Sequence, residues 1–167
     1  MDSTTDQIFQ QAILVVLRHE GGYVNDPKDA GGETKYGISK RTYPNVDIKN
    51  LTIDQATDIY YRDWWQHFGY GQITDAGLAT KVFDTAVNLG ASRCHKILQR
   101  CLKADGFPSI VDDGNLGPQS YNAINCCNPS TLLDLFRTAQ ANYYNAVVAA
   151  HPEDARFLNG WLKRAAE

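Results

Sequence analysis

The chain contains an apolar helical segment that ends at a glutamate followed by two glycines. Residues 5–20 carry apolar side chains at helical spacing, which predicts a buried or half-buried helix. Gly21 and Gly22 follow Glu20 directly, and glycine readily adopts the left-handed conformation that ends a helix. We expect residues 21–51 to form an irregular lobe with a short hairpin near Thr34 to Ile38. The pattern therefore places a carboxylic acid at a helix end, facing a glycine-rich loop.

This arrangement suits the hydrolysis of a glycosidic bond. That reaction needs a carboxylic acid that protonates the leaving oxygen, and it usually needs a second carboxylate. The negative end of the helix dipole and partial burial both favour the protonated form of a carboxyl group at position 20. Protonation is the property that a general acid requires. Taken alone, however, a glutamate before two glycines also fits an ordinary solvated helix end.

The residues around Glu20 carry a more specific signal. The sequence reads Glu20-Gly21-Gly22-Tyr23, Asn25-Asp26-Pro27, Asp29, Gly31-Gly32-Glu33-Thr34 and Tyr36-Gly37-Ile38-Ser39. In order and spacing, these residues resemble glycoside hydrolase family 108. That family comprises N-acetylmuramidases, found as phage endolysins and as bacterial muramidases that assist protein release.

Two further blocks extend the resemblance from about Ile8 to Arg164. One is the segment from Val82 to Gly90. The other comprises Leu98-Gln99, the run from Asp113 to Pro118 and the run from Phe157 to Arg164. This last block is similar to the small C-terminal peptidoglycan-binding region that usually follows the catalytic part of the family. The resemblance thus implies a catalytic muramidase region at 1–91 and a peptidoglycan-binding-like region at 92–167, packed on it.

The resemblance also implies catalytic residues. The family's catalytic glutamate lies in its Glu-Gly-Gly-Tyr motif, which corresponds to Glu20. In related phage lysozymes, eight residues separate a glutamate from an aspartate, and five residues separate that aspartate from a threonine. Asp29 fits the first spacing, whereas Thr34 comes one residue early and Lys35 occupies the threonine position. We expect Asp29 to be the second carboxylate and Thr34 to position a water or the sugar.

Two other acids of the loop are alternatives to Asp29. Asp26 lies in an Asn-Asp-Pro sequence, where an acidic residue before proline commonly caps a turn, so a structural role is favoured for it. Glu33 lies between Gly32 and Thr34, where an exposed position is the more common one.

Aromatic and amide side chains are the candidates for sugar binding. An aromatic ring stacks on the apolar face of a sugar and its polar tip hydrogen-bonds a sugar oxygen. Tyr23, Tyr36 and Trp64 are predicted for this role. Asn88 is the fourth candidate. It lies four residues after Asp84 on an expected helix, where both polar side chains need partners if they are buried. Asp84 is expected to brace the catalytic loop.

A second aromatic cluster lies in the expected helix at 52–68. Tyr60 and Trp64 are four residues apart, as are Tyr61 and Trp65, and this spacing puts each pair on one helix face. One pair is therefore expected in the core, while the other is available to line a groove.

The chain is expected to be mainly α, with a lysozyme-like helical fold, an irregular active-site lobe and a short β-hairpin. The expected helices are 5–20, 52–68, 75–89, 92–104, 117–125, 130–150 and 153–165. A length of 167 residues fits one compact domain, or a main domain with a small appended one. A content of 43% apolar and 21% charged residues is ordinary for a globular protein.

The charge and the hydropathy of the chain limit the kinds of binding partner that we expect. With a net charge of −3 and no basic stripe, we expect no nucleic acid. No apolar run is long enough to span a membrane, so no stable membrane insertion is expected. The first six residues are polar and acidic, unlike a signal peptide. We therefore expect synthesis in the bacterial or host cytoplasm and action in the periplasm and cell wall, reached through a holin or a secretion pathway.

Cysteine usage argues against disulfides and metal sites. Cys94 and Cys101 lie about 10.5 Å apart along an expected helix axis, too far for a bridge. Cys126 and Cys127 are adjacent, where a bridge is strained. Neither a Cys-x-x-Cys pair nor a histidine cluster points to zinc. We expect free thiols, no metal and no cofactor.

The leading hypothesis is a peptidoglycan hydrolase that cleaves the β-1,4 bond between N-acetylmuramic acid and N-acetylglucosamine, acting as a monomer on bacterial peptidoglycan. Two alternatives remain open. A lytic transglycosylase uses one glutamate and makes an anhydro-sugar, although the presence of Asp29 argues mildly against it. A non-catalytic cell-wall-binding module would bind the wall without releasing reducing sugar.

Overall fold

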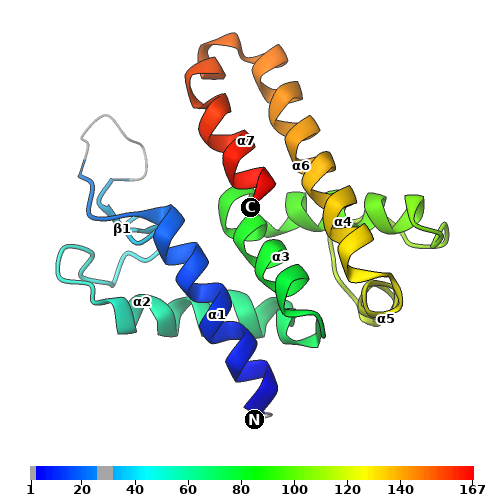
Figure 1. Cartoon of the computed structure of the whole chain (residues 1–167). Helices are drawn as coiled ribbons and strands as arrows, with labels where there is room; N and C mark the ends of the chain where they lie inside the picture. Colours follow the sequence, from blue (N-terminus) through cyan, green and yellow to red (C-terminus); the bar gives the residue numbers. More distant parts are fainter. Residues whose placement is uncertain (1–2, 26–31) are drawn as a thin grey trace. The chain divides into compact units, whose positions relative to one another are not determined.

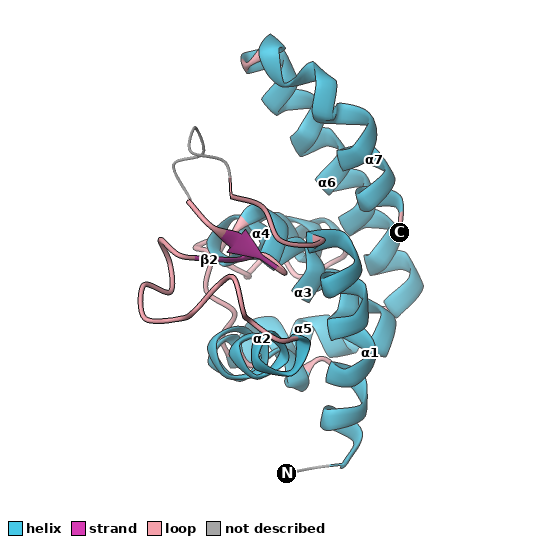
Figure 2. Ribbon diagram, turned by 90° about the vertical axis from the view of Figure 1, so that its left-hand side faces the viewer, coloured by secondary structure: helices cyan, strands magenta, loops and turns pink. Residues whose placement is uncertain are grey.

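The computed structural model describes the backbone of residues 3–25 and 32–167, and side chains from Gln7 onward within those ranges. Helices dominate this part of the chain, and the strands are short (Figures 1 and 2). The predicted mainly α fold with a small hairpin is therefore confirmed. The structure comprises two compact units, one ending at Gly71 and the other beginning at Gln72.

The first unit contains α1, a hairpin, α2 and two short irregular helices. The bounds are α1 Ser3–Glu20, β1 Thr34–Lys35, β2 Ile38–Ser39, α2 Ile53–Tyr60, a π-helical segment Tyr61–Gln66 and a 3-10 turn Tyr70–Gln72 that runs into the second unit. The strands pair antiparallel, with Thr34 opposite Ser39 and Lys35 opposite Ile38. The predicted hairpin near Thr34 to Ile38 is therefore confirmed.

The core of the first unit forms between α1 and the aromatic segment after α2. The buried face of α1 repeats at helical spacing and comprises Ile8, Phe9, Ala12, Ile13 and Val16. The Phe9 ring lies 4.8 Å from the Tyr61 ring and 5.5 Å from the Trp65 ring, measured between centroids. Helix α2 begins with a capping box, in which Thr52 and Gln55 each satisfy the other's backbone N–H group. These contacts anchor α2 beside the aromatic cluster.

The π-helical segment changes which aromatic side chains are buried. Tyr60 and Trp65, five residues apart, are each 1% exposed, whereas Tyr61 and Trp64 are half-buried. The expectation of a core pair spaced four residues apart is therefore wrong. A π-helix closes hydrogen bonds over five residues, so it rotates each later side chain backward relative to an α-helix. One member of each expected pair is buried instead.

The second unit is a helical bundle. Its bounds are α3 Ala76–Leu89, α4 Ala91–Ala104, α5 Pro118–Cys126, α6 Pro129–Ala150, a 3-10 segment Pro152–Phe157 and α7 Leu158–Ala166. Helix α6 packs along α7 and also contacts α3 and α4 (Figure 1). The helix expected at 153–165 is divided, because a tighter 3-10 turn begins at Pro152 and α7 follows from Leu158.

Helix α3 carries the core of this unit. The side chains of Leu78, Ala79, Val82, Phe83 and Ala86 are all at most 1% exposed. Because α3 packs on α4 and α6, it belongs to the second compact unit. The boundary predicted between the catalytic region and the peptidoglycan-binding-like region, at 91/92, rests on family resemblance and not on compactness. It stays a prediction.

Buried polar side chains tie the bundle together. Thr85 donates to Gln140, Gln140 donates to the Tyr144 hydroxyl, and Tyr144 donates to Asn88. The side chains of Thr85, Gln140 and Tyr144 thereby have hydrogen-bond partners in the core of the bundle, as burial demands.

Arg164 of α7 joins Asp84 of α3 in an ion pair with an Nη2–Oδ1 distance of 2.9 Å. The Asp84 side chain is 3% exposed and that of Arg164 is 11% exposed. Asp84 was expected to brace the catalytic loop. The ion pair shows it bracing the last helix of its own unit.

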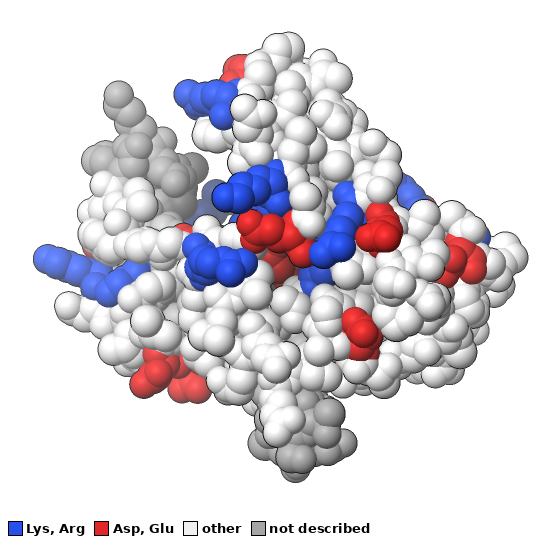
Figure 3. All heavy atoms as spheres, in the orientation of Figure 1, with Lys and Arg blue, Asp and Glu red and all other residues white. Residues whose placement is uncertain are grey.

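The four cysteines are free, as expected. No helix in the described ranges is both long and apolar enough to cross a lipid bilayer. On the face shown in Figure 3, basic and acidic side chains are interspersed over a mostly uncharged surface.

Candidate active site

Glu20 is the last residue of α1, and its side chain is half-buried. Gly21 ends the helix with φ +71°, a left-handed conformation that costs glycine little. The chain then leaves the helix axis, so the Glu20 carboxyl group lies at the helix end and faces the segment that follows. The predicted helix stop is confirmed.

The segment after the two glycines pairs with the start of the hairpin. Val24 and Thr34 exchange two backbone N–H···O hydrogen bonds of 2.8 Å. Beside this bridge, the Tyr23 hydroxyl donates a 2.8 Å hydrogen bond to Oε1 of Glu33. Residues 23–25 and 32–34 are thus fixed side by side. Asp29 and its alternative Asp26 lie between them, outside the described residues.

The interaction of Tyr23 with Glu33 has an electrostatic consequence. The hydrogen bond to the Glu33 carboxylate raises the pKa of the Tyr23 hydroxyl, and burial adds a smaller effect. Glu33 is half-buried rather than exposed, so the expected exposed position is wrong. Pairing with Tyr23 explains this difference.

The hairpin turns through only two residues, Tyr36 and Gly37, whose φ angles are +52° and +76°. Positive φ at both central residues defines a type I′ turn, which matches the twist of the strands. Glycine adopts this conformation easily, but a bulky side chain at positive φ costs about 1–2 kcal/mol. Among the described residues, Tyr36 is the one non-glycine with a positive φ. Such local strain persists only where surrounding contacts hold it.

One of those contacts comes from α2. The hydroxyl of Tyr60 donates a 2.9 Å hydrogen bond to the backbone carbonyl of Tyr36. Tyr60 is 1% exposed, so its hydroxyl is fixed by the packing of its ring. The turn is therefore attached to the aromatic core of the first unit.

Gly37 packs directly against Glu20. A Cβ atom at Gly37 would lie 2.9 Å from Cγ and 3.0 Å from Oε2 of Glu20, and it would overlap the Tyr60 hydroxyl. Only a residue without a side chain permits this approach. The Glu20 carboxyl group, the Tyr60 hydroxyl and the Tyr36–Gly37 turn thus form one packed cluster, which we call the Glu20 cluster.

The remaining predicted site residues divide between the two units. Thr34 is half-buried in β1, and its hydroxyl reaches the Gly32 carbonyl at 3.5 Å. Tyr36 is half-buried, with the Lys35 ammonium 5.4 Å from its ring centroid. Trp64 is half-buried, and its ring lies 6.4 Å from that of Tyr60. Asn88 lies in the second unit, where it accepts a hydrogen bond from Tyr144.

The first unit therefore brings Glu20, Tyr23, Thr34 and Tyr36 into one lobe. Sequence reasoning missed Gly37 and Tyr60 as members of the Glu20 cluster. Tyr36-Gly37 is a weak turn signal, because a type I′ turn usually begins with Asn, Asp or Gly. Nothing in the sequence links Tyr60 to a turn 24 residues earlier.

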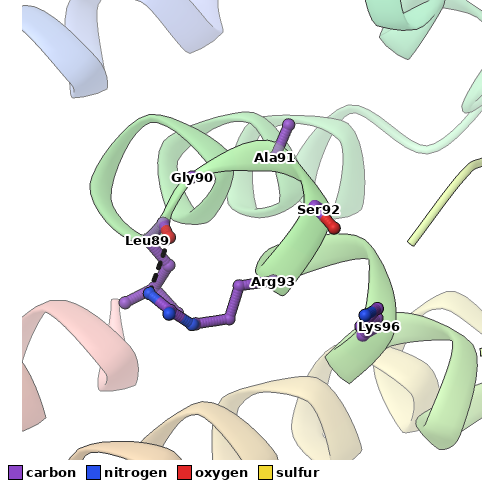
Figure 4. Close-up of a pocket in the computed structure, with 6 residues that line it drawn as sticks. All are labelled: Leu89, Gly90, Ala91, Ser92, Arg93 and Lys96. Atoms are coloured by element: carbon purple, nitrogen blue, oxygen red, sulfur yellow. Dashed lines mark hydrogen bonds between the residues drawn. The ribbon is translucent and has the colours of Figure 1, made fainter. Parts of the chain in front are cut away.

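The second unit contains a cavity of about 430 Å³ at the junction of α3 and α4 (Figure 4). It is lined by Leu89, Gly90, Ala91, Ser92, Arg93 and Lys96. Arg93 donates a 3.3 Å hydrogen bond to the Leu89 carbonyl, and its guanidinium lies 5.4 Å from the Tyr143 ring centroid. Two cationic side chains give this cavity a positive character.

The part of the chain that the structure describes contains no evident metal-binding site. No group of three or more His, Cys, Asp or Glu side chains there is arranged to hold a metal ion. The chemistry of the Glu20 cluster is that of a carboxyl group and hydroxyl groups.

Comparisons with known proteins show which families and structures the chain is similar to. Residues 13–90 match the family model of glycosyl hydrolase 108, and residues 93–166 match the model described as a predicted peptidoglycan domain. No curated protein matches the chain. Among solved structures, the chain is similar to Brucella abortus SagA, with 27% identity and a TM-score of 0.77 over 96% of this chain and 91% of that one.

The two family models meet between residues 90 and 93, next to the sequence-based boundary at 91/92. The Glu20 cluster lies wholly within the glycosyl hydrolase match. The chain thus combines a region that matches glycosyl hydrolase 108 with a C-terminal region that matches a peptidoglycan domain, and it is a peptidoglycan hydrolase.

Proposed function

We propose that the chain is an N-acetylmuramidase that cleaves the β-1,4 bond between N-acetylmuramic acid and N-acetylglucosamine, with Glu20 as the general acid. The observation that carries this proposal is the placement of Glu20. Its half-buried carboxyl group ends α1 and packs against the Tyr36–Gly37 turn. A carboxyl group held at a defined position beside a loop is what protonation of a leaving oxygen requires.

The reaction begins when Glu20 donates its proton to the glycosidic oxygen. The bond to the anomeric carbon then breaks, and positive charge develops on the sugar ring. We propose that Asp29 stabilises this oxocarbenium-like state, directly or through a water that it activates. Water then adds to the anomeric carbon and supplies the hydroxyl group of the new reducing end, while its other proton passes to a carboxylate of the site acting as general base. Thr34 is proposed to position that water or the sugar.

The glycan is proposed to contact the aromatic side chains of the first unit. Tyr23, Tyr36 and Trp64 each offer a ring face and a polar tip to a sugar. Tyr23 is exposed beside the Val24–Thr34 bridge, which supports a role at the surface of the lobe. Asn88 is the fourth proposed contact. Its carbonyl oxygen accepts from Tyr144, so its amide N–H group is the one proposed for the sugar.

The identity of the second carboxylate has its own test. Asp29→Asn is expected to abolish most of the hydrolytic rate, whereas Asp26→Asn is expected to retain more of it, because the sequence before Pro27 favours a structural role for Asp26. Initial rates of muropeptide release by the two variants give the comparison. Greater loss in Asp26→Asn would transfer the role to Asp26.

Product analysis tests the proposed reaction. Purified peptidoglycan digested by the wild type is expected to yield muropeptides with reducing N-acetylmuramic acid ends, because water enters the product. Anhydro-muramic ends, lighter by one water, would instead assign the chain to the lytic transglycosylases. Binding to the wall without any release would assign it to non-catalytic binding modules.

The cellular setting is also part of the proposal. A monomeric enzyme made in the bacterial or host cytoplasm would reach its substrate through a holin, as in phage lysis by an endolysin, or through a secretion pathway. Co-expression with a holin, with lysis followed by culture turbidity, tests the first route.

A further inference from the structure

The Tyr36–Gly37 turn does not hold its conformation by its own residues alone. Tyr36 has φ +52°, a region that bulky L-residues rarely occupy. Residues kept in such conformations depend on contacts from the surrounding structure. A contact that stabilises this turn also determines where Gly37 lies.

Tyr60 supplies a rigid contact of this kind. Its hydroxyl donates to the Tyr36 carbonyl across 2.9 Å, and its ring is 1% exposed. Tyr60 is the last residue of α2, whose start is fixed by the Thr52–Gln55 capping box. The π-helical segment follows directly, so Tyr60 lies between two anchored elements. Its hydroxyl therefore has little freedom to follow a displaced turn.

The Tyr36–Gly37 turn also limits the position of the Glu20 side chain. Both the Tyr60 hydroxyl and Oε2 of Glu20 lie within 3.0 Å of the point that a Cβ atom at Gly37 would occupy. The Glu20 side chain consequently rests against the α-carbon of Gly37. A shift of the turn would open space beside the carboxyl group or push it away.

We propose that Tyr60 is a positioning residue for Glu20, holding the Tyr36–Gly37 turn against the Glu20 carboxyl group through its hydrogen bond to the Tyr36 carbonyl. This inference rests on the proposed function, in which Glu20 is the proton donor. Tyr60 is proposed to act through the turn, by the hydrogen bond that its hydroxyl donates to the Tyr36 carbonyl. It is not assigned any contact with substrate.

Tyr60→Phe removes the hydroxyl and keeps the ring. Misplacement of a reacting group by about 1 Å lowers a rate roughly a hundredfold, so we expect kcat to fall by about ten- to a hundredfold. KM should change less than kcat, because Tyr36 is one of four proposed sugar contacts and the other three lie outside the turn. Soluble glycan fragments prepared from peptidoglycan provide a substrate for which kcat and KM are separable.

Tyr43→Phe is the matched control. Tyr43 lies in the same unit and is half-buried, and its hydroxyl interacts with the Asp63 and Trp64 side chains instead of with the turn. This variant loses a comparable hydrogen bond and should keep its wild-type kcat. Thermal unfolding of both variants shows whether either is unfolded at the assay temperature, which is set well below the lower melting temperature.

The outcomes separate positioning from a purely structural role. A fall in kcat for Tyr60→Phe in fully folded protein, absent from Tyr43→Phe, supports the proposal. A lower melting temperature with wild-type kcat would overturn it, since the hydroxyl would then serve stability alone. A rise in KM at unchanged kcat would also overturn it, because Tyr60 would then act on substrate binding.

Glu20→Gln, assayed in parallel, distinguishes this inference from the proposed function. If Glu20→Gln is inactive while Tyr60→Phe equals the wild type, the proposed function stands and the positioning role fails. If Glu20→Gln retains wild-type activity, the proposed function itself fails, and the positioning role fails with it.

Discussion

Glu20 and Gly37 lie so close together that a single added carbon on Gly37 would come within 2.9 Å of Cγ of Glu20. The contact joins the end of α1 to the turn of the hairpin, 17 positions later in the sequence. It links the stability of the turn to the position of the proposed proton donor.

Gly37→Ala is expected to lower both stability and activity. The left-handed conformation costs alanine about 1–2 kcal/mol, and overpacking against Glu20 and Tyr60 adds about 1–3 kcal/mol. Urea unfolding measures the loss of stability, and release of muropeptides measures the loss of activity. Gly160→Ala is the stability control, because Gly160 lacks a positive φ and has open space around its α-carbon. Equal unfolding free energies for the two variants would contradict the packing described for Gly37.

The Asp84–Arg164 ion pair gives a second prediction, within the helical bundle. Asp84→Asn leaves a buried guanidinium without its counter-charge, so we expect the free energy of unfolding to fall by about 3 kcal/mol. Urea denaturation at neutral pH measures the loss.

Asp112→Asn provides the contrast. Asp112 pairs with Arg100 and Lys103 at the surface, where the side chain is 30% exposed and the partners are more so. Such exposed pairs contribute about 1 kcal/mol or less. If Asp112→Asn were as destabilising as Asp84→Asn, burial would not be the property that makes the Asp84 pair important.

The buried Lys81 side chain makes the folding stability of the protein depend on pH in the alkaline range. Burial lowers the pKa of Lys81 to about 8 from its usual 10.5, although nearby Asp84 partly opposes this effect. Between these two values the unfolded state binds more protons than the folded state. Stability from this group therefore rises as pH increases from about 8 toward 10.5, while the full penalty for burying the charge is present below about 8.

Lys81→Met removes this dependence. The variant should be more stable than the wild type at pH 7, and its advantage should shrink as the pH approaches 10. The neutral amine of the wild type keeps its bond to the Arg164 carbonyl, 2.6 Å away, at high pH. Thermal unfolding of both proteins across this range gives the comparison. An advantage that stays constant with pH would show that Lys81 has an ordinary pKa in the folded state.

Much of the fold could be predicted from local patterns. The helix ending at Glu20 follows from apolar spacing and two glycines, and α6 begins where Asn128 and Pro129 supply a cap and a first helical residue. These signals act over a few residues, so one sequence is enough to read them. The hairpin was also predicted, although Tyr36-Gly37 is a weak signal for its two-residue turn.

Contacts between distant segments could not be predicted in this way. The π-helical segment after Tyr60 breaks the four-residue spacing that the aromatic pattern implied, and the Trp65 ring then packs against Phe9. The partner of Asp84 is 80 residues away on α7, and the turn that Tyr60 holds lies 24 residues before it. Such pairings depend on how helices pack, which residue spacing does not encode.

The roles proposed for Glu20, Asp29 and Thr34 came from motif resemblance, and they stay predictions. The structure adds a physical setting for Glu20 and Thr34, while Asp29 lies outside the described residues. The role of Glu20 therefore decides whether the proposed mechanism holds.

The most direct test is the rate at which Glu20→Gln solubilises purified peptidoglycan. The amide keeps the size of the side chain and cannot donate the catalytic proton, so we predict a rate at least about a hundredfold below wild type, in a protein with the same melting temperature. Glu153→Gln, which changes an exposed glutamate in the second unit, should keep the wild-type rate. A Glu20→Gln variant that digests the wall as fast as Glu153→Gln would contradict the assignment of Glu20 as the proton donor.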